Sequence, residues 1–205
     1  MKQKLVCLFL TLAMLVCPLT SCKDAGPAPA LEDIYDEVVA LIEASHSVND
    51  AVFGQGLPVH AIDSDYALEH HIYKDTDYAT YQYVTADSPF HSTGAIKAAL
   101  LAVYSADYVE SLSSVLFDGF AMGTKIVHAQ LYEQNGYLMQ RTDYEPLFTQ
   151  KRIYDYSSMR LVKPSNAQHL TIEVKSHLEG EDATVTDTLS LVLEEDGWRL
   201  DEPTF

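Results

Sequence analysis

The chain has 205 residues, and its 30 acidic residues outnumber its 13 lysines and arginines, which gives a formal net charge of −17. Such a surface repels the phosphates of nucleic acids and anionic lipid headgroups, so we expect no nucleic-acid partner. The charge favours a basic protein, a cationic ligand or divalent cations, unless the acidity serves only to keep the domain soluble.

The first 21 residues have the pattern of an export signal. Two lysines precede an apolar run, residues 5–16, that is shorter than the roughly 20 residues needed to span a bilayer. The sequence LTSC follows, ends at Cys22 and resembles the lipobox of bacterial lipoproteins. The resemblance implies a signal peptide over residues 1–21 and an extracytoplasmic domain held at a bacterial membrane by a lipid on Cys22. The alternative is an ordinary secreted protein with a chance cysteine at this place.

The cysteine count excludes several kinds of chemistry in the mature chain. Of three cysteines, Cys7 and Cys17 lie in the segment that is removed, which leaves the lipidated Cys22. The mature chain therefore has no disulfide, no thiolate nucleophile and no cysteine metal site. Removal of two lysines with the signal peptide leaves 11 basic and 30 acidic residues, a formal charge of −19.

A tether and one long helix are expected after the cysteine. Residues 22–30 contain two prolines and no apolar period, so they predict a flexible tether. From Leu31 to Gly54 apolar residues recur every three or four positions, which predicts one helix. The next segment, residues 56–77, has no regular period and is expected to be a loop with a short strand or a turn of helix.

A strand and a pair of helices are expected in the middle of the chain. Residues 78–85 are rich in aromatic and β-branched residues and predict a strand. Ser92 or Thr93 can cap a helix, and Asp107 can cap a second one that ends at Gly119. The alternative is a single kinked helix.

Beyond Gly123 the apolar residues alternate, which predicts antiparallel strands. Residues 129–133 and 137–141 flank Asn135-Gly136, the strongest short hairpin signal, because both central residues of that turn need positive φ. Further strands are expected at residues 157–163, 170–178, 185–193 and 198–200. Helices followed by an antiparallel meander predict an α+β fold with N-terminal helices packed on a curved antiparallel sheet, in one globular domain over residues 31–205.

The sequence lacks the common catalytic and cofactor motifs. It contains no G-x-S-x-G elbow, no H-E-x-x-H helix, no phosphate loop and no EF-hand loop, so we predict no enzyme activity and no cofactor. One segment collects possible metal ligands, namely Asp63, Asp65, Glu69, His70, His71, Asp75 and Asp77. Adjacent residues such as His70 and His71 point in different directions in a helix or a strand, so a solvated acidic loop without a bound metal is the favoured interpretation.

Thirteen tyrosines are more than a core of this size needs. Tyrosine is common at recognition surfaces because its rigid apolar ring carries a polar tip. We expect Tyr81, Tyr83 and Trp198 to be buried, whereas Tyr66 and Tyr73 are expected to be exposed on the acidic loop. The predicted partner-binding residues are Asp63, Asp65, Tyr66, Glu69, Tyr73, Asp75 and Asp77.

The order of elements, ending in the sequence DGWRL, resembles the NTF2-like and cystatin-like folds. Residues 35–200 are also similar to the IseA-type family of secreted inhibitors of cell-wall DL-endopeptidases. The likeness lies in residues 78–84, 96–117, the hairpin at Asn135-Gly136, and residues 159–163 and 195–200. It implies a non-enzymatic inhibitor, although a lipid anchor departs from a freely secreted family.

Two functions follow from these observations. The first is a binding or inhibitor module that docks a basic envelope protein, such as a cell-wall endopeptidase. The alternative is an NTF2-like domain with a pocket for a small ligand, acting as a hydrolase or isomerase. A large apolar cavity between helix and sheet would favour the pocket, and a filled interior with a charged loop would favour the docking module.

Overall fold

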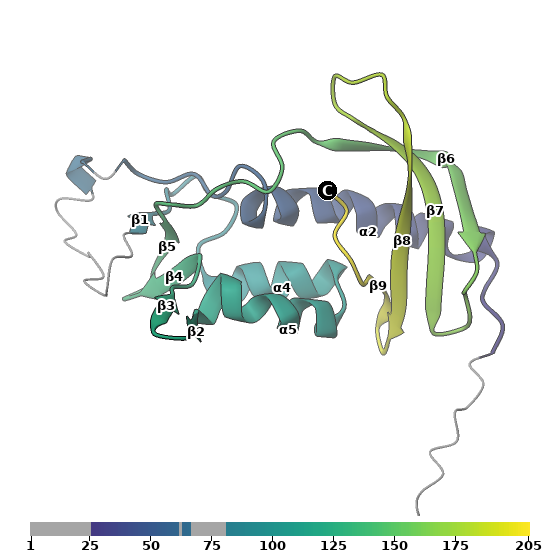
Figure 1. The fold of residues 1–205 in the computed structure, drawn as a ribbon, viewed down its shortest axis with the longest axis horizontal. Helices are drawn as coiled ribbons and strands as arrows, with labels where there is room; N and C mark the ends of the chain where they lie inside the picture. Colours follow the sequence, from purple (N-terminus) through teal and green to yellow (C-terminus); the bar gives the residue numbers. More distant parts are fainter. Residues whose placement is uncertain (1–25, 62, 67–80) are drawn as a thin grey trace, which may run out of the picture.

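The structure is a computed structural model that describes residues 26–61, 63–66 and 81–205 (Figure 1). Within these residues it has an α+β fold, in which helices come first and antiparallel strands follow. The signal peptide and Cys22 lie outside the described residues. So do Glu69, Tyr73, Asp75 and Asp77. No described helix is both long and apolar enough to cross a membrane.

The long helix α2, Leu31–Val52, runs along the long axis of the molecule (Figure 1). Its 22 residues span about 33 Å at the usual rise per residue. Two acids in its first turn, Glu32 and Asp33, complement the positive end of the helix dipole. One face is buried at the expected spacing of three and four residues, including Ile34, Val38 and Ile42. The predicted helix is confirmed, and it ends two residues before Gly54.

Two shorter helices follow, α4 over Thr93–Val103 and α5 over Ala106–Ser113. Ser92 caps α4, since its hydroxyl accepts a hydrogen bond from Ala95 N at 3.0 Å. The chain is extended at Tyr104, so the two are separate helices and not one kinked helix. Asp107 was expected to cap the second helix, but Ser105 does so by accepting from Tyr108 N at 3.1 Å. One turn of π-helix, η1 over Ser114–Asp118, extends α5.

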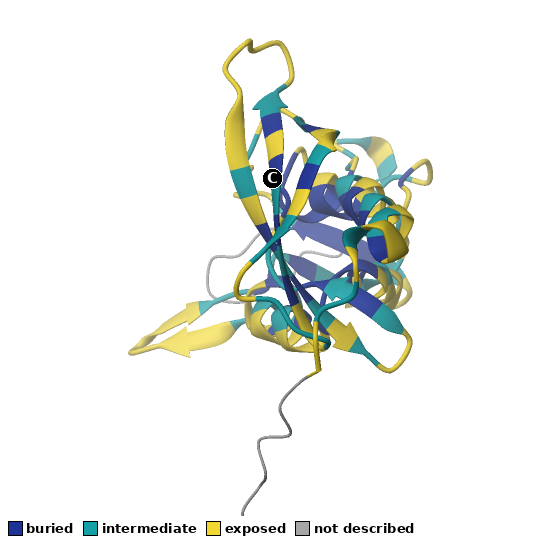
Figure 2. Ribbon diagram, turned by 90° about the vertical axis from the view of Figure 1, so that its right-hand side faces the viewer, coloured by how far each residue is buried: buried dark blue, intermediate teal, exposed yellow. Residues whose placement is uncertain are grey.

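The largest sheet contains the four last strands in the order β6-β7-β8-β9, all antiparallel. Alternate residues such as Leu170, Ile172 and Leu191 are buried, as the sequence pattern predicts. The buried residues gather where the helices meet the strands, and exposed ones face outward (Figure 2). The strands are β6 Arg152–Val162, β7 His169–Leu178, β8 Val185–Glu194 and β9 Gly197–Leu200.

The remaining strands form two smaller sheets. The order of the three-stranded sheet is β1-β5-β4, and its β4–β5 turn has positive φ at Asn135 and Gly136, 54° and 81°, as predicted. A separate hairpin, β2 with β3, was not predicted, because strands of three residues leave too little alternation to detect. The strands are β1 Tyr81–Tyr83, β4 Leu131–Gln134, β5 Tyr137–Arg141, β2 Phe120–Met122 and β3 Lys125–Val127.

The molecule is elongated, and its two ends differ. The four-stranded sheet surrounds the N-terminal part of α2, and the three-stranded sheet and the β2–β3 hairpin lie beyond its other end (Figure 1). The described chain begins at the four-stranded sheet, where Gly26 O accepts a hydrogen bond from Ala167 N at 2.8 Å. We therefore call the four-stranded end the tether end and the opposite one the distal end.

Candidate functional site

The described part of the predicted acidic loop lies at the distal end. Asp63 and Asp65 are exposed, as expected for a solvated loop. Tyr66 was expected to be exposed but is partly buried, because its ring stacks on His60 with centroids 4.3 Å apart. It also meets the edge of Tyr83 at 5.6 Å. The loop is therefore fastened to the three-stranded sheet through an aromatic contact that the sequence period does not reveal.

Tyrosines form a small core of their own in the three-stranded sheet. Tyr81 and Tyr83 are 4% and 3% exposed and pack with Met139, which confirms the prediction that they are core residues. The Tyr81 hydroxyl donates to Ala129 O at 2.7 Å. Much of the tyrosine excess is thus structural. Trp198 is buried as predicted, and its backbone N–H donates to the carboxylate of Glu37 at 2.8 Å.

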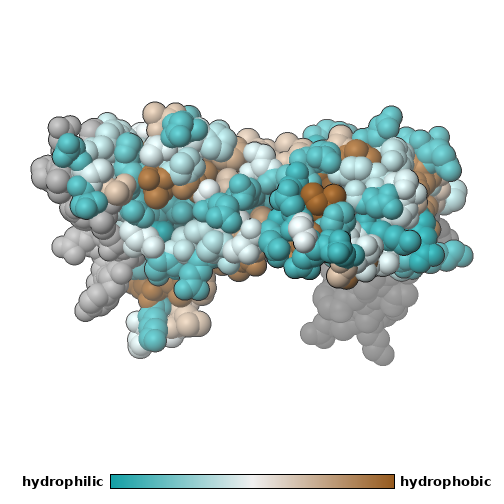
Figure 3. Space-filling view, turned by 90° about the horizontal axis from the view of Figure 1, so that it is seen from above, coloured by the Kyte–Doolittle hydropathy of each residue, from teal (hydrophilic) through white to brown (hydrophobic). Residues whose placement is uncertain are grey.

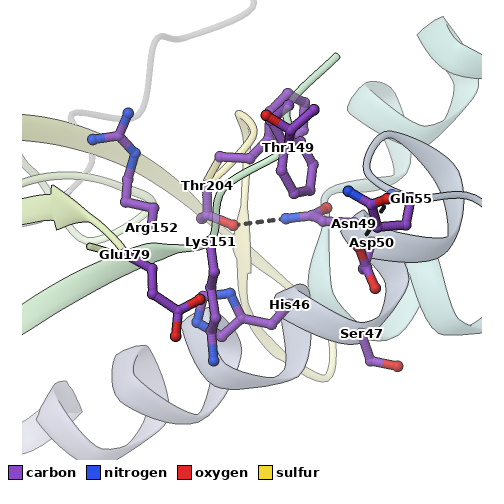
Figure 4. A pocket seen from close by; sticks show the side chains of 12 residues that line it. His46, Ser47, Asn49, Asp50, Gln55, Thr149, Lys151, Arg152, Glu179 and Thr204 are labelled. Carbon is purple, nitrogen blue, oxygen red and sulfur yellow. Dashed lines mark hydrogen bonds between the residues drawn. The ribbon is translucent and has the colours of Figure 1, made fainter. Parts of the chain in front are cut away.

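A cleft of about 380 Å³ opens at the C-terminal end of α2 (Figure 4). Four distant parts of the chain form it: the end of α2 with Gln55, the segment from Phe148 to the start of β6, Glu179 after β7, and the last two residues. Sequence reasoning did not find this cleft, because nothing local marks residues that only the fold brings together. Its walls include His46, Asn49, Asp50, Phe148, Lys151 and Thr204.

The floor of the cleft is a buried hydrogen-bond network. The Thr204 hydroxyl lies 2.6 Å from the hydroxyl of Ser45 and accepts from the amide of Asn49 at 2.9 Å. Asn49 in turn accepts from the hydroxyl of Tyr104 at 2.6 Å. Burial raises the pKa of Tyr104, so it stays a neutral donor. A satisfied network of this kind holds the floor rigid and leaves the rim groups to meet a ligand.

The rim of the cleft carries both signs of charge. Burial, followed by the nearby ammonium of Lys151, lowers the pKa of His46 below its usual value, so the ring is neutral near pH 7. Lys151 forms no ion pair within the described residues, whereas each described arginine forms one. Arg152 is bound to Asp187 at 3.3 Å. Asp50 accepts a hydrogen bond from Gln55 N at 3.1 Å.

A second hollow, of about 400 Å³, lies at the distal end beside the β2–β3 hairpin. Leu147 on its rim is 71% exposed, and Met122 and Ile126 on the hairpin are 60% and 59% exposed. Both strands of the hairpin are exposed to solvent. The face of the molecule seen in Figure 3 is largely hydrophilic, with scattered apolar areas. The distal apolar surface, as we call it, comprises the exposed large apolar side chains of the hollow and the hairpin, namely Val115, Phe120, Met122, Ile126 and Leu147.

A glycine fixes the direction of the β2–β3 hairpin. Gly119 has φ 71° and ψ 170°, a conformation that is essentially confined to glycine. A Cβ atom there would lie 2.7 Å from Val127 O and 3.1 Å from Ala129 N. Gly123, which has φ 64° in the turn between the two short strands, is the one local signal of this hairpin.

Within the described ranges, no three His, Cys, Asp or Glu side chains come together as possible metal ligands. No protein-family model matches the chain, and no curated protein matches it either. The function is therefore argued from the cleft, the distal apolar surface and the position of the tether.

Proposed function

We propose that the protein is a lipid-anchored, non-enzymatic binding module that docks a basic protein of the bacterial envelope through its distal end. The observation that carries this proposal is the distal apolar surface, where Leu147 at the hollow and Met122 and Ile126 on the two faces of the hairpin are each more than half exposed. Large apolar side chains are costly to expose in water, and several of them at one end of a molecule commonly mark an interaction site. An isolated two-stranded hairpin is also only marginally stable, so a partner would stabilise it.

The filled interior supports docking over a small-ligand pocket between helix and sheet. Val38 and Ile42 of α2 are completely buried, and Leu170 and Ile172 of the sheet are 1% and 0% exposed. These side chains belong to one continuous hydrophobic core. An NTF2-like pocket between these two layers would need space that the core occupies.

The geometry suits presentation to a partner away from the membrane. The described chain enters at the tether end, beside the β6–β7 turn. The distal apolar surface lies beyond the other end of a helix about 33 Å long. A lipid on Cys22 and a tether up to residue 30 would therefore leave this surface facing away from the anchor.

The charge of the distal end supports a basic partner. Asp118 is the last residue of η1, immediately before the hairpin, Glu145 lines the hollow, and Asp63 and Asp65 are exposed at the same end. The formal charge of −19 in the mature chain also opposes association of two copies. A partner whose binding face has a cationic rim around an apolar centre would complement both the acidic residues and the exposed apolar side chains of the distal end. The resemblance of the sequence to endopeptidase inhibitors makes a cell-wall hydrolase the first partner to test.

The test compares two pairs of apolar-to-serine changes on the purified full chain. We expect Met122→Ser with Ile126→Ser to abolish capture of basic cell-wall endopeptidases on the immobilised protein. The control pair, Val185→Ser with Leu193→Ser, alters side chains that are 48% and 46% exposed on the four-stranded sheet and should leave capture unchanged. Capture should weaken with salt, because the screening length falls from about 10 Å at 0.1 M to about 3 Å at 1 M.

Two results would contradict the proposal. If the two double variants capture endopeptidases equally well, the distal apolar surface is not the docking site. Endopeptidases that bind but keep full activity at saturating protein would exclude inhibition. The anchor is tested separately by Cys22→Ala, which should move the protein from the membrane to the soluble fraction without changing its circular dichroism.

A further inference from the structure

The cleft at the end of α2 differs in charge from the rest of this acidic protein. Lys151 and Arg152 bring two cations to it, and Asp50 and Glu179 bring two anions, while His46 is neutral near pH 7. Arg152 is already bound to Asp187, so Lys151 is the cation left to meet a ligand. A cleft with both signs of charge repels neither a cation nor an anion and is suited to a ligand that carries both.

We propose that this cleft binds a small zwitterionic peptide of dipeptide size, with its carboxylate at Lys151 and its amino group at Asp50. This cleft shares no lining residue with the distal hollow, and the proposal does not rest on protein docking there. The cleft volume of about 380 Å³ falls at the small end of ligand-binding pockets.

The spacing of the charges sets the length of the ligand. His46 and Asp50 lie four residues apart on α2 and therefore on one face, about 6 Å apart along the axis. The side chain of Lys151 ends at the ring of His46 (Figure 4), and its charge lowers the pKa of His46, so the cationic side of the cleft lies at the level of His46. Two extended residues span roughly 7 Å, whereas the two charges of a single amino acid are much closer together. A dipeptide matches this spacing.

An aromatic wall provides the apolar part of the site. The rings of Phe148 and Phe205 stack with centroids 4.8 Å apart, and both are partly exposed to the cleft. Gly54 allows the ring of Phe148 to lie against the end of α2, since a Cβ there would be 2.7 Å from Phe148 Cζ and 2.9 Å from Asp50 Cα. An apolar side chain of the peptide can pack on this wall.

The polar groups between the charges suit a peptide bond. Gln55 offers an amide donor and acceptor on the same rim, and Thr149 offers a hydroxyl (Figure 4). A phosphate ester fits less well, because Asp50 and Glu179 would repel its two negative charges. The rigid hydrogen-bonded floor below them limits the reorganisation that binding requires.

The test is a titration of the isotope-labelled full chain with the dipeptide Ala-Phe, followed by amide chemical shifts in nuclear magnetic resonance. We expect saturable shifts at His46, Asn49 and Thr204, and none at Met122 and Ile126 of the β2–β3 hairpin. Acetylation of the peptide's amino group or amidation of its carboxylate should each weaken binding by about two- to fivefold, because exposed charges contribute modestly. The peptide capped at both ends should bind most weakly.

Two single changes identify which charge meets which end. Lys151→Gln should remove the effect of amidation, and Asp50→Asn should remove the effect of acetylation, each without affecting the other end. The matched control is Lys163→Gln, which should behave like the parent chain. Lys163 is exposed and directly follows the last residue of β6, whereas Lys151 directly precedes the first. Absence of shifts at the cleft, or equal binding of free and doubly capped peptide, would overturn the proposal. Neither outcome bears on docking at the distal end.

Discussion

The two ends of α2 meet surroundings that are held together in different ways. At the tether end, long strands of 10 and 11 residues pair antiparallel, with one register shift between Asp155 and Arg160 of β6, and bury alternate side chains against the helix. At the distal end, strands of three to five residues form two small sheets, and large apolar side chains are exposed. Long paired strands bury enough surface to fix a fold, whereas short ones leave surface free for a partner.

The same contrast appears in the polar groups. The tether half contains Glu37, which fastens the β8–β9 hairpin to α2 by accepting from Trp198 N. The distal half combines aromatic contacts, such as the stacking of Tyr66 on His60, with hydrogen bonds such as that from the Tyr81 hydroxyl to Ala129 O. We therefore expect changes at the tether half to act on folding and changes at the distal half to act on binding.

The largest effect should come from the core of the four-stranded sheet. Ile172 is completely buried, so Ile172→Ala should lower the free energy of unfolding by about 2–5 kcal/mol through lost burial and the cavity left behind. Met122→Ala at the distal end should change it by less than about 0.5 kcal/mol, because that side chain is 60% exposed. Denaturant unfolding measures both. Similar values for the two variants would show that the hairpin is part of the folding core.

A pair of glycines gives the next largest effect. Gly119→Ala should cost about 1–3 kcal/mol, because the residue occupies a glycine-only conformation and the new Cβ would contact Val127 O. Gly136→Ala, in the β4–β5 turn, should cost only about 1 kcal/mol, since its φ of 81° is strained for alanine but no atom lies within 4 Å. Thermal unfolding compares them. A larger loss at Gly136 would mean that the contact at Gly119 is relieved by movement of the hairpin.

The smallest effect should appear in alkaline solution. Burial raises the pKa of Tyr108 in α5 and of Tyr144 at the distal hollow to about 12 in each case. A raised tyrosine pKa means that stability is fully present below about pH 10 and is lost as pH rises through about 12. Tyr144→Phe should remove part of this loss of stability, because phenylalanine has no hydroxyl to ionise. In the folded protein the Tyr144 hydroxyl donates a hydrogen bond to Gly54 O at 2.8 Å. The free energy of unfolding measured between pH 8 and 11.5 tests this prediction. If it falls with pH as steeply in the variant as in the parent chain, Tyr144 does not contribute to the loss.

The acidic loop was the predicted binding segment, and the structure describes only part of it. Asp63 and Asp65 are exposed at the distal end, the end that we propose for docking. Their role as partner-binding residues stays a prediction. Tyr66 is fastened to the sheet instead of being free in solvent, because the rings of His60, Tyr83 and Tyr137 surround it. A ring at an irregular position finds such neighbours only after the strands have paired.

The sequence alone determined the local elements, because their signals act between near neighbours. The three- and four-residue spacing from Leu31 fixes α2, the hydroxyl of Ser92 fixes the start of α4, and Asn135-Gly136 fixes the β4–β5 turn. Alternation over ten residues likewise fixes the faces of β7 and β8. These features depend on contacts within a few residues, so a single sequence is sufficient to predict them.

The tertiary structure decided how the elements divide and which side chains meet. It placed the short strands in two further sheets, left the β2–β3 hairpin exposed, and selected Ser105 over Asp107 as the cap of α5. It also formed the cleft, whose floor joins Asn49 to Thr204 across 155 residues of chain. Contacts over such separations depend on the competition of many apolar surfaces for burial, and no local pattern records the outcome of that competition.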